Sequence, residues 1–128
     1  MRIDRRKAMA VLGGGAAAAP TAALAQRRRG RGPEAPKVRF LHGVASGDPS
    51  DNGAVLWTRV TPDGPLDTPV EVFVQVGTRA SLRDLEQENL VRTSAARDFT
   101  VKNFVSGLEP GREYFYRFRV GEALSPVG

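Results

Sequence analysis

Apolar and polar residues alternate most regularly near the carboxyl end of the chain, over residues 114–120. One set of alternate positions holds Tyr114, Tyr116, Phe118 and Val120, and the other holds Phe115, Arg117 and Arg119. Successive side chains of a β-strand point to opposite faces of a sheet. The pattern therefore predicts a strand with one face in a hydrophobic core.

A tight turn is expected just before this strand, at Pro110-Gly111, because proline presets one backbone torsion and glycine tolerates the next. Leu108 lies three residues before Gly111, and Tyr114 lies three residues after it. This spacing resembles the tyrosine corner of immunoglobulin-like and fibronectin type III sandwiches, where the phenol bonds to upstream backbone. We therefore predict an all-β sandwich of that kind and assign structural roles at its corner to Leu108, Pro110, Gly111 and Tyr114.

Other apolar segments predict the remaining strands of the sandwich. We expect strands over residues 39–45, 53–60, 70–76 and 99–105. Apolar residues occupy both faces of segment 53–60, which includes Trp57, and this favours a central strand in which Trp57 has a structural role. In segment 70–76, valines take the inward positions, and Phe73 interrupts an otherwise polar outer face.

Two connections between these strands have recognisable patterns. Residues 47–53 are dense in glycine, aspartate, proline and asparagine and predict a turn. Ser81, followed three residues later by Asp84, predicts the start of a short helix inserted between strands.

Two positions disturb the predicted sandwich. Asn103 shares a face with Val101 and Val105, so it must find partners or the strand must bulge, since an unpaired buried amide costs about 1–3 kcal/mol. Residues 124–128 begin like a last strand and then stop. We therefore expect an incomplete final strand and an open sheet edge.

Residues 1–25 have a basic start, an apolar middle and a small-residue cleavage site, which together predict an export signal. Arg5 and Arg6 form a twin-arginine pair, and the weakly hydrophobic middle favours the Tat route over the Sec route. Ala23 and Ala25 form the pattern that a signal peptidase reads. We expect a periplasmic or secreted protein that meets the Tat translocase and signal peptidase during export. The alternative is a membrane anchor, but consecutive glycines argue against a stable membrane span.

Residues 26–38 are rich in arginine, glycine and proline and predict a flexible linker before a folded domain over residues 39–128. Of the net charge of +5, residues 1–25 contribute +3 and residues 26–39 contribute +5, so residues 40–128 carry −3. The alternative for the linker is a nucleic-acid-binding arm, but it lacks interleaved aromatic residues. We therefore expect no nucleic-acid partner.

Few residues offer catalytic or metal-binding chemistry. The chain has no cysteine, which excludes disulfides and thiolate metal sites, and its single histidine, His42, forms no triad or zinc site. We expect His42 to be a half-buried structural residue. Asp48, Asp51 and Asn52 could offer oxygen ligands to calcium, but a turn explains them better.

One further set could form a binding platform. Trp57 and Arg59 share a face of their strand, and Tyr116 could lie across from them. A carbohydrate or phosphate site is conceivable there, although core packing with an arginine stacked on an aromatic ring is favoured. We assign no catalytic, cofactor-binding or metal-binding residue to this chain.

Several motifs in order along the chain resemble the alkaline phosphatase D (PhoD-like) family. These are FLHGVASGDP over residues 40–49, VLWTRVTP over residues 55–62, GLxPGxxYxYRF over residues 107–118, and SPVG over residues 125–128. The resemblance implies an exported phosphomonoesterase or phosphodiesterase with a fibronectin-like N-terminal domain and a larger metallophosphatase domain. It also implies iron and calcium in that larger domain, whose metal ligands all lie beyond residue 128.

Two hypotheses of different classes follow. In the first, the chain is the non-catalytic N-terminal domain of a PhoD-like phosphatase, and its partner is a catalytic domain absent from this chain. Phe73, Phe104 and Phe115 are then candidates for the interface. In the second, the chain is a free-standing secreted fibronectin-like binding module.

Overall fold

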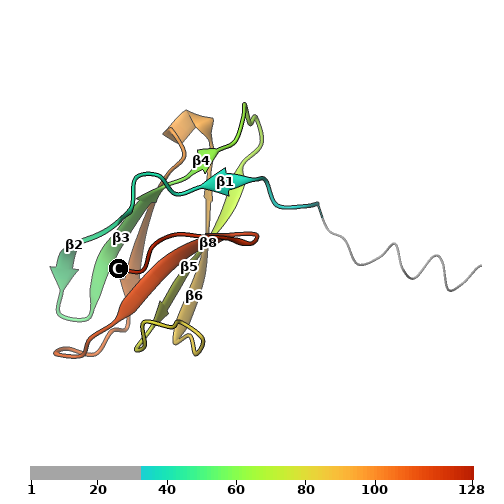
Figure 1. The fold of residues 1–128 in the computed structure, drawn as a ribbon. Coiled ribbons are helices and arrows are strands. Elements are labelled where there is room, and N and C mark those ends of the chain that lie inside the picture. Colours follow the sequence, from blue (N-terminus) through green and yellow to red (C-terminus); the bar gives the residue numbers. More distant parts are fainter. Residues whose placement is uncertain (1–32) are drawn as a thin grey trace, which may run out of the picture. The chain divides into compact units, whose positions relative to one another are not determined.

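Residues 33–128 form a β-sandwich in the computed structural model, which describes only these residues (Figure 1). The predicted signal peptide, residues 1–25, and residues 26–32 of the predicted linker lie outside the described residues. The predicted all-β class is confirmed, since the described residues contain strands and one three-residue 3-10 helix, η1 (Ala95–Arg97).

The strands form two main sheets and one short pair, all antiparallel. The first sheet has the order β2-β3-β7 and consists of β2 (Val44–Ser50), β3 (Gly53–Arg59) and β7 (Thr100–Ser106). The second has the order β6-β5-β8-β9 and consists of β5 (Val70–Gly77), β6 (Gln87–Thr93), β8 (Phe115–Val120) and β9 (Ala123–Leu124). The short pair consists of β1 (Val38–Arg39) and β4 (Thr61–Pro62).

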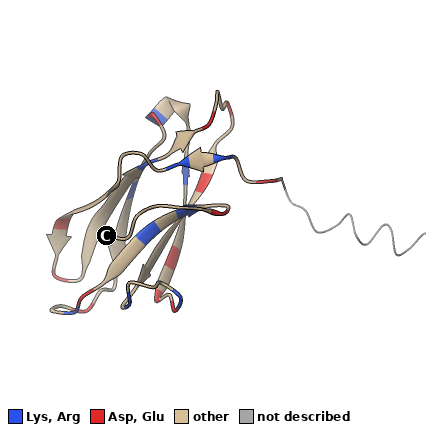
Figure 2. Cartoon of the chain, viewed as in Figure 1, with Lys and Arg blue, Asp and Glu red and all other residues tan. Residues whose placement is uncertain are grey.

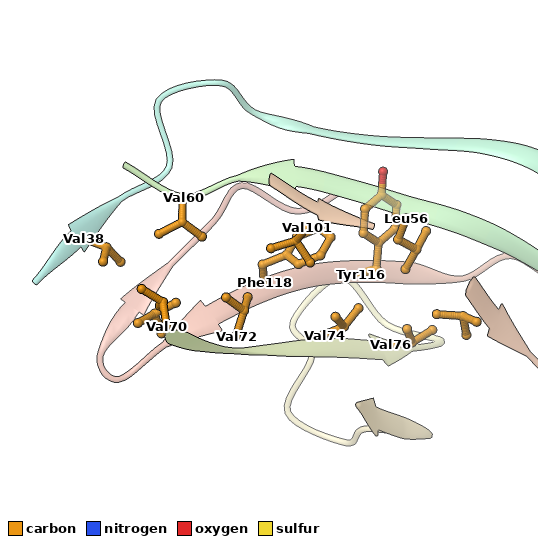
Figure 3. Close-up of a cluster of buried hydrophobic side chains, with 12 residues drawn as sticks. Val38, Leu56, Val60, Val70, Val72, Val74, Val76, Val101, Tyr116 and Phe118 are labelled. Atoms are coloured by element: carbon orange, nitrogen blue, oxygen red, sulfur yellow. The ribbon is translucent and has the colours of Figure 1, made fainter. Parts of the chain in front are cut away.

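The core lies between the two sheets, and its buried residues from these sheets come from β3, β5, β7 and β8 (Figure 3). The second sheet contributes Val70, Val72, Val74, Val76, Tyr116, Phe118 and Val120, and the first contributes Leu56, Val101 and Val105. The rings of Tyr116 and Phe118 pack edge to face, with centroids 6.2 Å apart. The inward valines of β5 and the alternation of β8 confirm the sequence prediction for these two strands.

The predicted strand over residues 39–45 is wrong as a single element. The chain pairs Val38 and Arg39 with β4, turns at residues 41–42, and begins β2 only at Val44. Gly43 takes a left-handed φ of 69° at this break, and its carbonyl accepts a hydrogen bond from the Thr58 hydroxyl at 2.8 Å. Val38, the last residue of the predicted linker, is already buried.

The turn predicted over residues 47–53 is narrower than expected. Strand β2 continues to Ser50, and only Asp51 and Asn52 form the turn to β3. The register shifts between Gly47 and Ser50, where Asp48 has a φ of 47°. This irregularity ends regular pairing while leaving β3 in the central position that the sequence predicts.

The helix predicted from Ser81 is wrong, and the strand that follows it was not predicted. Residues 78–86 form a loop in which Leu82 is buried with a φ of 47°, close to Gly77. Burial of this leucine against the sheet overrides a weak local preference for helix. The sequence pattern does not predict strand β6, because its inward positions include the polar residues Gln87 and Asn89 and therefore show no apolar alternation.

The final segment follows β8 further than the two residue pairs between β8 and β9 suggest. Beyond β9, the backbone N–H of Ser125 donates to the Phe118 carbonyl at 2.9 Å. Gly128 exchanges two backbone hydrogen bonds with Tyr116, at 3.0 and 3.1 Å. The expectation of an open edge is therefore wrong for this part of β8, which residues 123–128 cover.

Asn103 lies on the core side of β7, as its spacing predicts. Neither the expected bulge nor a hydrogen-bond partner for its Nδ2 atom is present within residues 33–128. The strand pairs regularly with β3 along its whole length, so there is no bulge. The buried Nδ2 atom of Asn103 has no hydrogen-bond partner within residues 33–128. This position is therefore a cost to stability of about 1–3 kcal/mol.

Candidate interaction surface

The corner before β8 is held by one hydrogen bond within its own loop and one to the β2–β3 turn. The Tyr114 hydroxyl accepts from the backbone N–H of Glu109 at 2.9 Å, and the Asn52 carbonyl accepts from the N–H of Leu108 at 2.8 Å. Gly111 has a φ of 74°, which favours glycine. Leu108 and Tyr114 both pack against the core, so the corner ties the two sheets together.

Arg112 braces the same corner from outside. Its guanidinium pairs with Glu86 at 2.9 Å and with Glu109 at 3.1 Å, and it lies 5.6 Å from the Tyr114 ring centroid. Desolvation lowers the pKa of Arg112, but the charges of Glu86 and Glu109 outweigh it and raise the pKa above its usual value. Arg112 therefore serves as a structural cation at this corner.

His42 is exposed, not half-buried as expected, and it belongs to a cluster around Arg59. Arg59 Nη1 donates to His42 Nε2 at 2.7 Å, and Arg59 Nη2 pairs with Asp98 Oδ1 at 2.7 Å. Arg59 Nε also donates to the Asp98 carbonyl at 3.1 Å. The cluster ties β3 to the loops before β2 and after η1, and it contains no serine, threonine, cysteine or lysine.

Metal-binding geometry does not appear within residues 33–128, where no three His, Cys, Asp or Glu side chains gather closely enough to hold an ion. Asp48, Asp51 and Asn52 are exposed around the β2–β3 turn. These residues do not fit the iron and calcium that the family resemblance implies. Figure 2 shows basic and acidic residues interspersed along the strands and loops of residues 33–128. No helix among the described residues is long and apolar enough to cross a bilayer.

On the outer face of the β6-β5-β8-β9 sheet, polar side chains bind one another between two exposed leucines, Leu90 on β6 and Leu124 on β9. Gln75 is only 5% exposed, and it donates to Glu88 at 2.6 Å and accepts from Arg117 at 2.7 Å. Arg119 lies over the Phe73 ring, 4.5 Å from its centroid, so Phe73 is half-buried. Arg117 also reaches the Leu82 carbonyl in the loop that folds over this sheet. These contacts leave few polar groups on this face without a hydrogen-bond partner.

The outer face of the β2-β3-β7 sheet carries a group of adjoining apolar residues beside Arg59 and Lys102. Strand pairing places Val55 between Gly47 and Phe104, and Trp57 between Ala45 and Lys102. We call this surface the Trp57 face; it consists of Ala45, Gly47, Val55, Trp57, Lys102 and Phe104. The ring of Phe104 extends over Gly53, where even a Cβ atom would lie 2.7 Å from it.

Not all residues expected at an interface or platform lie on the Trp57 face. Phe104 does and is 53% exposed, whereas Phe73 and Phe115 are half-buried on the other sheet. Tyr116 packs in the core beside Leu56, whose side chain points away from Trp57. The platform of Trp57, Arg59 and Tyr116 is therefore not assembled.

Together, the fold and its surfaces define a β-sandwich domain with an apolar outer face and, within residues 33–128, no assembled catalytic or metal-binding set. A sequence profile described as "PhoD-like phosphatase, N-terminal domain" matches residues 23–128. The chain belongs to this family.

Two comparisons agree with this membership. The chain is 37% identical over 94 residues to alkaline phosphatase D of Bacillus subtilis (strain 168), and the match covers 70% of this chain and 16% of that protein. It also matches a solved chain titled "Structure of PhoD", with a TM-score of 0.66 and 37% identity over 70% of this chain and 18% of that one. The chain thus corresponds to less than a fifth of each relative.

Proposed function

We propose that this chain is the non-catalytic N-terminal domain of an exported PhoD-like phosphatase and that it packs on a catalytic part of that protein. The observation that carries the proposal is the extent of the match. Residues 23–128 match the family's N-terminal domain, and the match covers only 16% of alkaline phosphatase D. The catalytic residues and any iron and calcium would then belong to the remaining part.

The structural role of such a domain is to fold stably and present a fixed surface. The strand orders β2-β3-β7 and β6-β5-β8-β9 and the corner at Tyr114 support a sandwich of the fibronectin type III kind. We propose domain limits of 1–25 for the signal peptide, 26–38 for the linker and 39–128 for the sandwich, with Val38 packed at its start.

A segment exchange tests the accessory role. Residues 23–128 replace the matching segment of alkaline phosphatase D, and phosphatase activity is compared with that of a variant lacking the segment. The proposal predicts that the exchange restores the amount of folded, active enzyme that the deletion loses. Equal activity of the deletion and the intact enzyme, or an exchange no better than the deletion, would contradict it.

Export is tested separately. Replacement of Arg5 and Arg6 by lysine should stop export through the Tat translocase and leave the full-length precursor inside the cell. N-terminal sequencing of the exported product should begin at Gln26, after Ala23-Leu24-Ala25. A product that is exported equally well by the double-lysine variant would contradict the Tat route.

The second candidate, a free-standing secreted binding module, has one observation in its favour. Residues 125–128 hydrogen-bond along β8 as a final strand would, so the sandwich is covered there. This candidate predicts a cooperative monomer that unfolds at the same temperature whether or not a phosphatase part is attached. Any increase in that temperature on attachment would favour the first candidate.

A further inference from the structure

The two outer faces of the sandwich differ in how many of their side chains form ion pairs, hydrogen bonds or stacking contacts with one another. On the β6-β5-β8-β9 sheet, Arg92 pairs with Glu71, Arg119 stacks on Phe73, and Gln75 is buried under bonds to its neighbours. On the Trp57 face, Lys102 has no ion-pair partner within residues 33–128. Leu90 and Leu124 are exposed on the first of these faces, but Arg119 lies between them. On the Trp57 face, the half-buried Val55 and Trp57 adjoin the exposed Phe104. A contiguous apolar surface of this kind is typical of an interface.

The composition of the Trp57 face also suits an interface. Trp57 and Phe104 are aromatic residues of the kind enriched at the centres of interfaces, where fully buried charges are depleted. Ala45 and Gly47 on β2 are small, so a partner could approach the strand backbone closely. Lys102 borders Trp57 and would meet an acidic group on the partner.

The size of this face distinguishes between possible partners. Three strands at about 4.8 Å spacing and about 23 Å length present roughly 300 Å² on each partner, or about 600 Å² in total. Interfaces between domains of one chain begin at about 600 Å², whereas stable interfaces between separate proteins bury about 1,200–2,000 Å². The Trp57 face therefore suits a covalently attached domain better than a second copy of this chain.

We propose that the Trp57 face is the surface through which this domain packs on the phosphatase part of a PhoD-like protein, a proposal that rests on the function proposed above. The contact region on that part is apolar, accommodates Trp57 and Phe104, and carries an acidic residue opposite Lys102. The opposite outer face stays in solvent.

A matched pair of variants tests this assignment in the segment exchange with alkaline phosphatase D. Phe104→Glu changes the Trp57 face, and Leu90→Glu changes the opposite face at a side chain of similar exposure, 53% against 48%. Both variants should leave the Tm of the free 128-residue chain unchanged. Attachment should raise the Tm of the unmodified domain by about 4–8 °C, the shift that corresponds to about 1 kcal/mol of stabilisation, and only Phe104→Glu should lose this increase.

The outcomes separate this proposal from the proposed function. If Leu90→Glu loses the increase and Phe104→Glu keeps it, packing is real but uses the other face, which overturns the face assignment alone. If attachment never changes the Tm, packing itself fails and both proposals fall. If the free chain sediments as a dimer that Phe104→Glu dissociates, the occupant is a second copy, which overturns this proposal.

A measurement on the unmodified proteins covers the case in which Phe104→Glu disturbs folding. Hydroxyl-radical labelling with mass spectrometry compares the free chain with the exchange protein. Labelling of Trp57 and Phe104 should fall on attachment, while labelling of Leu90 should stay the same. Unchanged labelling of Trp57 and Phe104 would overturn the proposal.

Discussion

The hydroxyl of Tyr114 accepts a hydrogen bond from the backbone N–H of Glu109 at 2.9 Å, across the turn that leads into β8. Tyr114→Phe removes this bond and keeps the ring, so it should cost about 0.5–1.5 kcal/mol. The Tm should fall by about 4–8 °C for each kcal/mol in a domain of this size. Tyr116→Phe is the matched control, because no hydrogen bond to its hydroxyl is present within residues 33–128, and it should change the Tm less.

The left-handed backbone of the same turn gives a second prediction. Gly111→Ala should destabilise the domain by about 1–2 kcal/mol, because alanine is strained at a φ of 74°. Open space surrounds a Cβ at both Gly111 and Gly64, so Gly64→Ala is a control that differs in backbone conformation alone. Urea unfolding of both variants measures the difference, and equal midpoints would contradict the explanation.

Asn103 offers a route to a more stable domain. Asn103→Val removes the amide whose Nδ2 has no partner within the described residues and places a β-branched side chain among Val101 and Val105. The variant should gain about 1–3 kcal/mol of unfolding free energy. Lys102→Val, on the opposite face of β7, should stay within about 0.5 kcal/mol. A less stable Asn103→Val variant would show that the amide is satisfied in solution.

Phe118 lies at the centre of the core and is fully buried. Phe118→Ala should cost about 3–5 kcal/mol, which is a large part of the about 5–15 kcal/mol that stabilises a typical domain. Circular dichroism during thermal unfolding should show loss of the cooperative transition or a much lower midpoint. Phe104→Leu, at an exposed phenylalanine of β7, should have little effect on the free chain.

The sequence predicted the parts of the fold in which local pattern and tertiary burial agree. The inward valines of β5 and the alternating aromatic residues of β8 meet each other in the core, with Val74 paired to Phe118 and Val76 to Tyr116. The local sequence pattern gave wrong predictions where contacts with residues distant in the sequence determine the backbone conformation. Leu82 forms no helix because it is buried close to Gly77, and β6 is defined by pairing with β5 despite its polar inward residues.

Surface assignments depended even more on strand pairing. The alternation around Trp57 indicates which residues share its face of β3, but it does not indicate which residues of β2 and β7 lie beside them. Ala45 and Lys102 become neighbours of Trp57 only through the register of β3 with both of its neighbouring strands, β2 and β7. The same holds for Arg59, whose contacts with His42 and Asp98 join residues far apart in the sequence.

Phosphatase assay of the purified 128-residue chain tests the central claim most directly. Hydrolysis of p-nitrophenyl phosphate is measured at alkaline pH, with and without added iron and calcium, beside intact alkaline phosphatase D. The account predicts no turnover above the rate in buffer under any metal condition. Saturable, metal-dependent hydrolysis that purifies with the chain would contradict the claim that its sandwich is an accessory domain.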